Sequence, residues 1–188
     1  LGWSTITSQV DSWLAQTHPE LFNFNNNADY NTQSLTSLGG DWSGVDQWNA
    51  DITKAAGQAG VPANLIKAVM KLESNGVNLG ANGATAVGPM QVTTSNWGAW
   101  AQQNGLDLYN PSDNILAGAM ILKQNYDQYQ GWAVQNGINP WKAAVYAYYA
   151  GNPYNLLAAD DPSQGGSGMS TAQYGDQIWN SFTQLQLG

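Results

Sequence analysis

Glu73 is the residue whose type and position indicate chemistry most directly. The chain has 188 residues and only two glutamates, Glu20 and Glu73. Glu73 follows Ile66, Val69 and Met70 by seven, four and three residues, so on a continuous helix it shares their apolar face. Burial on that face and the carbonyl end of the helix dipole both raise the pKa of a carboxyl group. A proton held near neutral pH suits a general acid, although the same spacing is compatible with a glutamate that turns to solvent.

The charged residues are few and mostly acidic. Five lysines, no arginine and 13 acidic residues give a net charge of −8. A nucleic acid would find no cluster of basic side chains, so we expect no nucleic-acid partner. The 20 Asn, 17 Gln, nine Trp and nine Tyr combine neutral hydrogen-bonding groups with aromatic faces. Such a surface suits an uncharged carbohydrate, but the same composition is compatible with a polar secreted protein of another kind.

The sequence predicts neither a cofactor nor a membrane span. The absence of Cys excludes disulfides, iron–sulfur clusters and thiol catalysis, and a single histidine, His18, excludes a His-rich zinc site. An alternating run of oxygen-bearing side chains suggests a Ca²⁺ loop but lacks the Gly and the terminal Glu of an EF-hand. That run consists of Asn23, Asn25, Asn27 and Asp29. No apolar run reaches the roughly 18 residues of a membrane-spanning helix.

The elements that must position Glu73 are mainly helices. Apolar spacing and start signals predict helices at 4–16, from Ser43, from Pro62 to near Ser74, and at about 95–104, 112–130, 140–150 and 170–186. Ser170 and Gln173 have capping-box spacing at the start of the last helix. Glycines interrupt residues 76–92, where we expect a small hairpin or an irregular loop. We expect residues 1–40 to form an N-terminal helix and an Asn-rich loop as an appendage, and residues 41–188 to form one domain.

Four short motifs follow one another along the chain. They are Glu73-Ser74, Gly88-Pro89-Met90-Gln91, Asn110-Pro111 followed by Asn114-Ile115 and Gly118, and Ala147-Tyr148-Tyr149-Ala150-Gly151. In this order and spacing they resemble the soluble lytic transglycosylase family, which has a goose-type lysozyme-like fold. The resemblance covers residues 61–154 and implies a mostly α, lysozyme-like helical domain with a small β-hairpin or irregular Gly-rich excursion.

The resemblance implies an enzyme that cleaves peptidoglycan glycan strands. Its reaction breaks the β-1,4 bond between N-acetylmuramic acid and N-acetylglucosamine and leaves a 1,6-anhydro ring on the muramic acid. Glu73 would serve as acid and then as base. Ordinary glycosidases use two carboxyl groups. The chain has no Asp or Glu between Glu73 and Asp107, which favours a transglycosylase over a hydrolase. Asp107 or Asp113 could still supply the second group of a muramidase.

The resemblance also implies roles for residues around Glu73. Ser74 would orient the acid or contact the substrate, or simply end the helix, and Gln91 would hydrogen-bond the sugar. Met90 would form the floor of the site or pack in the core. Tyr148 could hydrogen-bond Glu73. Tyr149 is a departure, because the family usually has Asn there to hold the substrate. Some tryptophans could stack on sugar rings. These are Trp97, Trp100, Trp132 and Trp141.

Two readings of a different class remain open. The domain could be a wall- or chitin-binding module that has lost its chemistry, as the Tyr at position 149 would allow. It could also be a structural part of a phage tail or a secretion apparatus, with residues 1–60 docking to a partner. The chain begins at Leu1, so we expect it to have been trimmed. The expected location is outside the cell or in its envelope.

Overall fold

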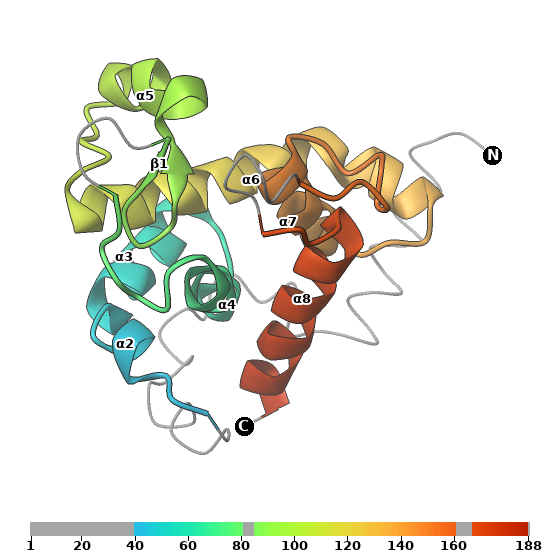
Figure 1. The fold of residues 1–188 in the computed structure, drawn as a ribbon, viewed down its shortest axis with the longest axis horizontal. Helices are drawn as coiled ribbons and strands as arrows, with labels where there is room; N and C mark the ends of the chain where they lie inside the picture. Colours follow the sequence, from blue (N-terminus) through green and yellow to red (C-terminus); the bar gives the residue numbers. More distant parts are fainter. Residues whose placement is uncertain (1–39, 81–84, 161–166, 188) are drawn as a thin grey trace.

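The computed structural model describes residues 40–80, 85–160 and 167–187 and is mostly helical (Figure 1). The elements are α2 (Ser43–Asp46), α3 (Asn49–Ala59), α4 (Ala63–Glu73), β1 (Ala86–Val87), β2 (Val92–Thr93), α5 (Thr94–Gln103), α6 (Pro111–Gln135), α7 (Pro140–Ala150) and α8 (Thr171–Leu187). The expected mostly α fold with a small hairpin is confirmed. The predicted helix at 4–16 and the run Asn23, Asn25, Asn27 and Asp29 lie outside the described residues.

The starts of the later helices follow from local capping. Helices α6 and α7 each begin at a proline, whose missing N–H is not needed there. The side chain of Asn110 accepts hydrogen bonds from the first amides of α6, and Asn139 does the same for α7. At α8 the predicted capping box is present. The amide of Ser170 donates to Gln173 Oε1 at 2.8 Å, and the amide of Gln173 donates to Ser170 Oγ at 3.1 Å.

The helix predicted from Ser43 is divided in two. Helix α2 ends at Asp46 and α3 begins at Asn49, with Gln47 and Trp48 between them. Trp48 leaves the helical conformation, and its indole N–H donates to the carbonyl of Gly76 at 2.8 Å. This bond ties the break between α2 and α3 to the turn that follows α4. A tertiary contact of this kind overrides the apolar periodicity on which the prediction was based.

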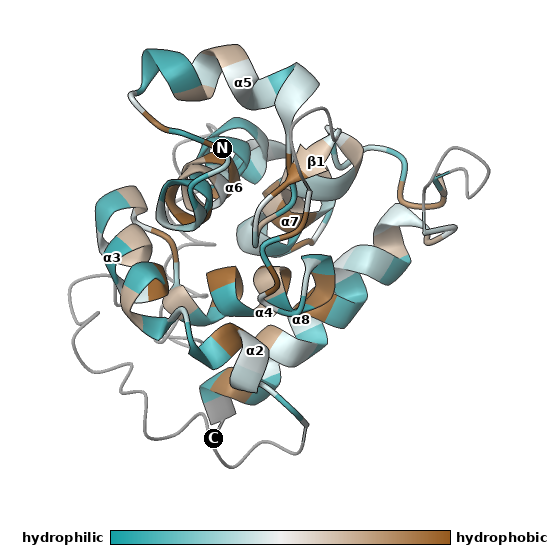
Figure 2. Cartoon of the chain, turned by 60° about the vertical axis from the view of Figure 1, so that its left-hand side comes forward, coloured by the Kyte–Doolittle hydropathy of each residue, from teal (hydrophilic) through white to brown (hydrophobic). Residues whose placement is uncertain are grey.

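Helix α4 lies at the centre of the molecule. Its residues 64–70 are all buried, and α2, α3, α6 and α8 pack around it (Figure 1). Helix α7 packs against α6 and α8. Hydrophobic residues gather on α4 and α7 in the middle of the molecule, whereas much of α3 and α5 is hydrophilic (Figure 2). The middle of α4 is therefore enclosed by elements from several parts of the chain, whereas its end, which carries Glu73, is only partly buried.

The predicted hairpin is present and packs on α6. Ala86 pairs with Thr93 and Val87 with Val92 in antiparallel register. The turn between the strands brings Met90 against Gly118 of α6, where an added Cβ would come within 2.8 Å of the methionine side chain. Gly118 therefore permits the close approach that fixes the hairpin beside α4.

Candidate active site

Glu73 is the last residue of α4 and is partly buried. Burial raises the pKa of its carboxyl group to about 7, because removal from water disfavours the charged form. The hydroxyl of Tyr174 donates a hydrogen bond to Glu73 Oε1, which stabilises the carboxylate and opposes part of that rise. None of the ion pairs among the described residues includes Glu73. The carboxyl group can therefore both hold and release a proton near neutral pH.

Tyr174 is the main site residue that the sequence did not reveal. It lies on α8 and is 3% exposed, on the same buried face as Ile178 and Phe182. Burial first, and then the negative charge of Glu73, raise the pKa of Tyr174 well above that of a free tyrosine. Its hydroxyl thus remains a donor over the working pH range. The sequence predicted the helix that carries Tyr174, but it gave no sign that the phenol reaches Glu73.

Tyr148 does not make the hydrogen bond expected of it. Its hydroxyl donates to the carbonyl oxygen of Met90 at 2.8 Å, and the bond to Glu73 comes from Tyr174 instead. Tyr148 still lies close to the acid. Its pKa is raised well above the usual value, chiefly by burial and then by the charge of Glu73. The hydroxyl of Tyr174 therefore holds the carboxyl group of Glu73, and the hydroxyl of Tyr148 holds the hairpin turn beside it.

Ser74 and Met90 attach the hairpin to the end of α4. The hydroxyl of Ser74, which is 7% exposed, donates to the carbonyl of Pro89 at 2.6 Å and accepts from the amide of Gly76 at 3.0 Å. The side chain of Met90 is fully buried. In this geometry Met90 packs in the core beneath the site, and Ser74 fixes the turn that follows Glu73.

Gln91 lies at the tip of the hairpin with a φ of 49°, a left-handed conformation that few residues other than glycine adopt. Its side-chain amide nitrogen donates to the carbonyl of Gly88 at 2.9 Å, which offsets some of the cost of that conformation. The side chain is partly exposed. The amide group of Gln91 is thus held in a fixed orientation at the surface next to Met90.

Asn114 holds the hairpin from the other side. Its side chain is fully buried, accepts from the amide of Met90 at 2.9 Å, and donates to the carbonyls of Val87 and Leu108 at 2.9 and 3.0 Å. A Cβ on Gly88 would lie 2.1 Å from this amide group. The motif at 110–118 therefore supports the site by positioning the hairpin, which its residue types alone did not indicate.

Tyr149 packs on the tyrosine that holds the acid. Its ring and that of Tyr174 are stacked, with centroids 4.4 Å apart and planes inclined by 15°. Its hydroxyl donates to the carbonyl of Met169 at 2.8 Å and lies 3.2 Å from Ser167 Oγ. Tyr149 thus joins the end of α7 to the segment that leads into α8.

The two downstream carboxylates are engaged elsewhere. Asp113 Oδ2 accepts from the amide of Asp107 at 3.0 Å, and Asp107 Oδ1 accepts from the amide of Tyr109 at 2.9 Å. Both groups therefore stabilise the turn that leads into α6. Two of the tryptophans considered for sugar stacking, Trp97 and Trp100, pack edge to face with centroids 5.4 Å apart. Trp141 is 2% exposed and belongs to the core, while Trp132 contacts Tyr154.

Two kinds of feature are absent from the part of the chain that the structure describes. No three His, Cys, Asp or Glu side chains gather there in a way that could hold a metal ion. None of the described helices is both long and apolar enough to cross a membrane.

Two comparisons relate this sequence to known proteins. The sequence model described as "Transglycosylase SLT domain" matches residues 51–158. That segment includes Glu73 and the hairpin but ends before Tyr174. The chain is also 34% identical over 88 residues to a protein of Enterobacteria phage PRD1 named "Transglycosylase". The similarity covers 46% of this chain and 32% of the phage protein, so the chain matches about a third of the length of that relative.

Proposed function

The chain belongs to the transglycosylase SLT domain family, and on this basis we propose that it is a peptidoglycan lytic transglycosylase with Glu73 as its single acid and base. Membership of the family implies a glycan substrate. The role of Glu73 as acid and base rests on its surroundings. Its carboxyl group is partly buried, has a pKa of about 7 and accepts a hydrogen bond from Tyr174.

The proposed reaction moves one proton out of Glu73 and one back. Tyr174 donates to Oε1, which leaves Oε2 to carry the proton. Glu73 gives this proton to the glycosidic oxygen of the N-acetylglucosamine while the bond to C1 of the N-acetylmuramic acid breaks. The carboxylate then takes the proton of the C6 hydroxyl of the same muramic acid as that oxygen bonds to C1. The product is a 1,6-anhydro ring, Glu73 is protonated again, and no water is consumed.

The arrangement of carboxylates supports this route over hydrolysis. A hydrolase of this kind would need a second carboxyl group about 5 Å away as a nucleophile or further away as a base for water. The chain has no Asp or Glu between Glu73 and Asp107, and both Asp107 and Asp113 bind backbone amides ahead of α6. The C6 hydroxyl is tethered to the reacting sugar and gains the advantage of an intramolecular nucleophile.

The proposed surroundings of the substrate follow from the same residues. Gln91 offers a fixed amide for an N-acetyl group, while Ser74, Met90 and Tyr148 hold the backbone that carries it. A peptidoglycan substrate would place the enzyme outside the cell or in its envelope, which includes the setting of a phage or a secretion apparatus.

Substitution of Glu73 by Gln tests the proposal, with Asp107→Asn as the matched control for the loss of a carboxylate. General acid catalysis contributes about 10²–10⁴ in rate, so Glu73→Gln should clear purified cell walls at least about a hundredfold more slowly. Asp107→Asn should stay within about threefold of the wild type, since its carboxylate serves the turn. Circular dichroism verifies the fold of both variants. Clearing by Glu73→Gln at more than a tenth of the wild-type rate would refute the role of Glu73.

A further inference from the structure

The stacked pair of tyrosines places a side chain from α7 directly behind the group that holds Glu73. Tyr149 and Tyr174 are stacked with centroids 4.4 Å apart, and the hydroxyl of Tyr174 donates to Glu73 Oε1. A ring packed face to face restricts rotation of its neighbour about the side-chain torsions. The direction of the Tyr174 hydroxyl therefore depends on the ring of Tyr149.

Tyr149 is itself fixed at its far end. Its hydroxyl donates to the carbonyl of Met169 at 2.8 Å and lies 3.2 Å from Ser167 Oγ. Ser167 is in turn held by Asp160, whose Oδ2 accepts from the amide of Ser167 at 2.7 Å. The ring of Tyr149 is thus fixed between the helix that carries it and the segment before α8. It forms a firm support for Tyr174.

A purely structural role for Tyr149, in joining α7 to α8, is already filled by another residue. Tyr146 lies one turn earlier on α7, and its hydroxyl donates to Asp176 Oδ1 of α8 at 3.2 Å. Its ring fits against Gly175, where an added Cβ would come within 2.1 Å. Tyr146 therefore offers a matched control, since its hydroxyl also joins α7 to α8 while the ring stacked on Tyr174 is that of Tyr149.

We propose that Tyr149 is a positioning residue for the acid: its ring holds Tyr174 in the orientation in which the phenol donates to Glu73. The role of Glu73 as the acid is taken from the proposed function. An asparagine, the residue expected here from the family resemblance, has no ring and could not give this support. The aromatic ring at position 149 thus acts through Tyr174.

Loss of the ring of Tyr149 should shift the pKa of Glu73 in a defined direction. The structure places the phenols of Tyr148 and Tyr174 around the carboxyl group, with Tyr149 behind the latter. A donor to the carboxylate lowers the pKa of Glu73, so loss of alignment of Tyr174 should raise it. Entry of water after loss of a bulky ring would lower the pKa instead. A rise in the pKa therefore indicates that Tyr149 supports Tyr174, whereas a fall indicates that its ring only shields Glu73 from water.

Carbon-13 NMR of the glutamate carboxyl groups measures this pKa without any substrate. The chain has only two glutamates, so selective labelling gives two carboxyl signals, and Glu73→Gln identifies the one from Glu73. Tyr174→Phe removes the donor and should raise the midpoint by about one pH unit. Tyr149→Leu should raise it by roughly half a unit or more. Tyr149→Phe keeps the ring and should stay near the wild-type midpoint, as should the control Tyr146→Phe.

Two further measurements complete the test. In the Tyr174→Phe background, Tyr149→Leu should have no additional effect on the midpoint, because the donor is already gone. In cell-wall digestion, Tyr149→Leu should lower kcat roughly tenfold with KM within about twofold, since a misdirected acid affects the reaction and not binding. If Tyr149→Leu lowers the melting temperature too far for titration, Tyr149→Asn takes its place.

An unchanged or lowered midpoint in the folded Tyr149→Leu variant would overturn the proposal, as would an equal rise in Tyr146→Phe. Failure of the proposed function is a separate result. It would appear as an active Glu73→Gln variant, whereas the titration reports on the three side chains whatever reaction they serve.

Discussion

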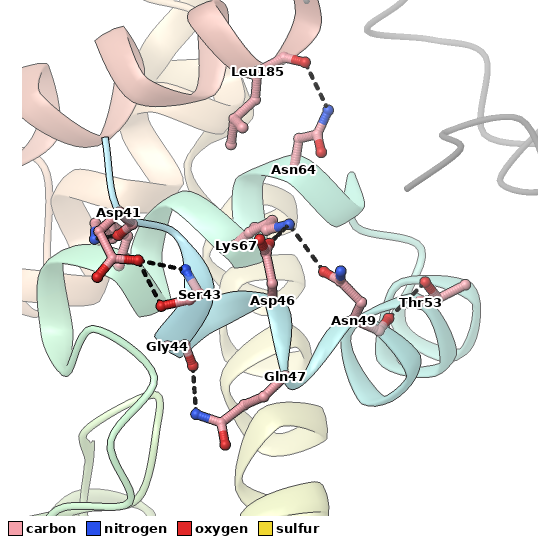
Figure 3. Close-up of polar contacts among 11 residues, drawn as sticks. Asp41, Ser43, Gly44, Asp46, Gln47, Asn49, Thr53, Asn64, Lys67 and Leu185 are labelled. Atoms are coloured by element: carbon pink, nitrogen blue, oxygen red, sulfur yellow. Dashed lines mark hydrogen bonds and ion pairs between the residues drawn. The ribbon is translucent and has the colours of Figure 1, made fainter. Parts of the chain in front are cut away.

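Lys67 and Glu73 lie on the same helix, α4, and both are withdrawn from water, but their surroundings differ. Lys67 is 1% exposed, its ammonium group forms an ion pair with Asp46, and it donates to Asn49 Oδ1 at 2.9 Å (Figure 3). Glu73 receives a phenol hydrogen bond and takes part in none of the ion pairs among the described residues. An opposite charge offsets part of the cost of burying a charged group, whereas a neutral donor leaves most of the effect of burial on the pKa of a carboxyl group.

Burial therefore serves the structure at Lys67 and the chemistry at Glu73. The ion pair of Lys67 joins α2 and the start of α3 to α4, so it helps to fix the fold around the middle of the helix. Glu73 at the end of the same helix gains no such pairing, and its pKa is raised to about 7. Perturbed carboxyl groups of this second kind are found at active sites, and the cost appears in stability.

Loss of the partner of Lys67 should lower the stability of the fold. Asp46→Asn leaves the ammonium group buried without its counter-charge, and the unfolding free energy should fall by about 3 kcal/mol. Chemical denaturation at pH 7 measures it. Cell-wall clearing per folded molecule should stay near the wild-type rate, because the carboxylate of Asp46 pairs with Lys67 and makes none of the contacts described at Glu73. A loss below about 1 kcal/mol would mean that the pair does not stabilise the fold.

Loss of the charge at position 73 should change stability in the opposite direction. The folded-state pKa of Glu73 is raised from 4.5 to about 7, so the folded protein binds more protons than the unfolded chain between these values. Stability contributed by the protonated group is therefore complete below pH 4.5 and is lost as the pH rises to 7. Glu73→Gln, which stays neutral, should be more stable than the wild type at pH 8 by up to about 3 kcal/mol.

Thermal or chemical unfolding of Glu73→Gln at pH 4 and pH 8 checks this sign. The two proteins should have the same stability at pH 4, where Glu73 is protonated in both the folded and unfolded states. Equal stability at both pH values would contradict the raised pKa. Together with Asp46→Asn, the result would establish that one charge on α4 stabilises the fold and the other opposes it.

Much of the fold could be predicted because its signals are local. The caps at Asn110 and Asn139 and the reciprocal bonds of Ser170 and Gln173 depend only on neighbouring residues, and they fixed three helix starts. The break at Trp48 could not be predicted, since it depends on a hydrogen bond to Gly76, which is distant in the sequence.

The candidate site could likewise be predicted only in part. Glu73 became a candidate because its spacing puts a glutamate on an apolar helix face. That spacing also allows a glutamate that turns to solvent, and the motifs that resemble the transglycosylase family favoured the chemical role. The partner of Glu73 could not be identified, because Tyr174 reaches the carboxyl group from α8 and resembles any other core tyrosine in the sequence. The expected bond from Tyr148 to Glu73 was wrong for a related reason. The tertiary packing of the hairpin offers that hydroxyl the carbonyl of Met90 instead.

The products of peptidoglycan digestion test most directly the claim that one carboxyl group makes both proton transfers. The digestion is carried out in ¹⁸O-labelled water, and the muropeptides are weighed before and after treatment with borohydride. The account predicts muramic acid ends that are lighter by one water, contain no ¹⁸O and resist reduction, because the C6 hydroxyl closes the ring. Reducible ends that carry ¹⁸O would contradict it. They would mean that water attacks the sugar and that a second group must activate it.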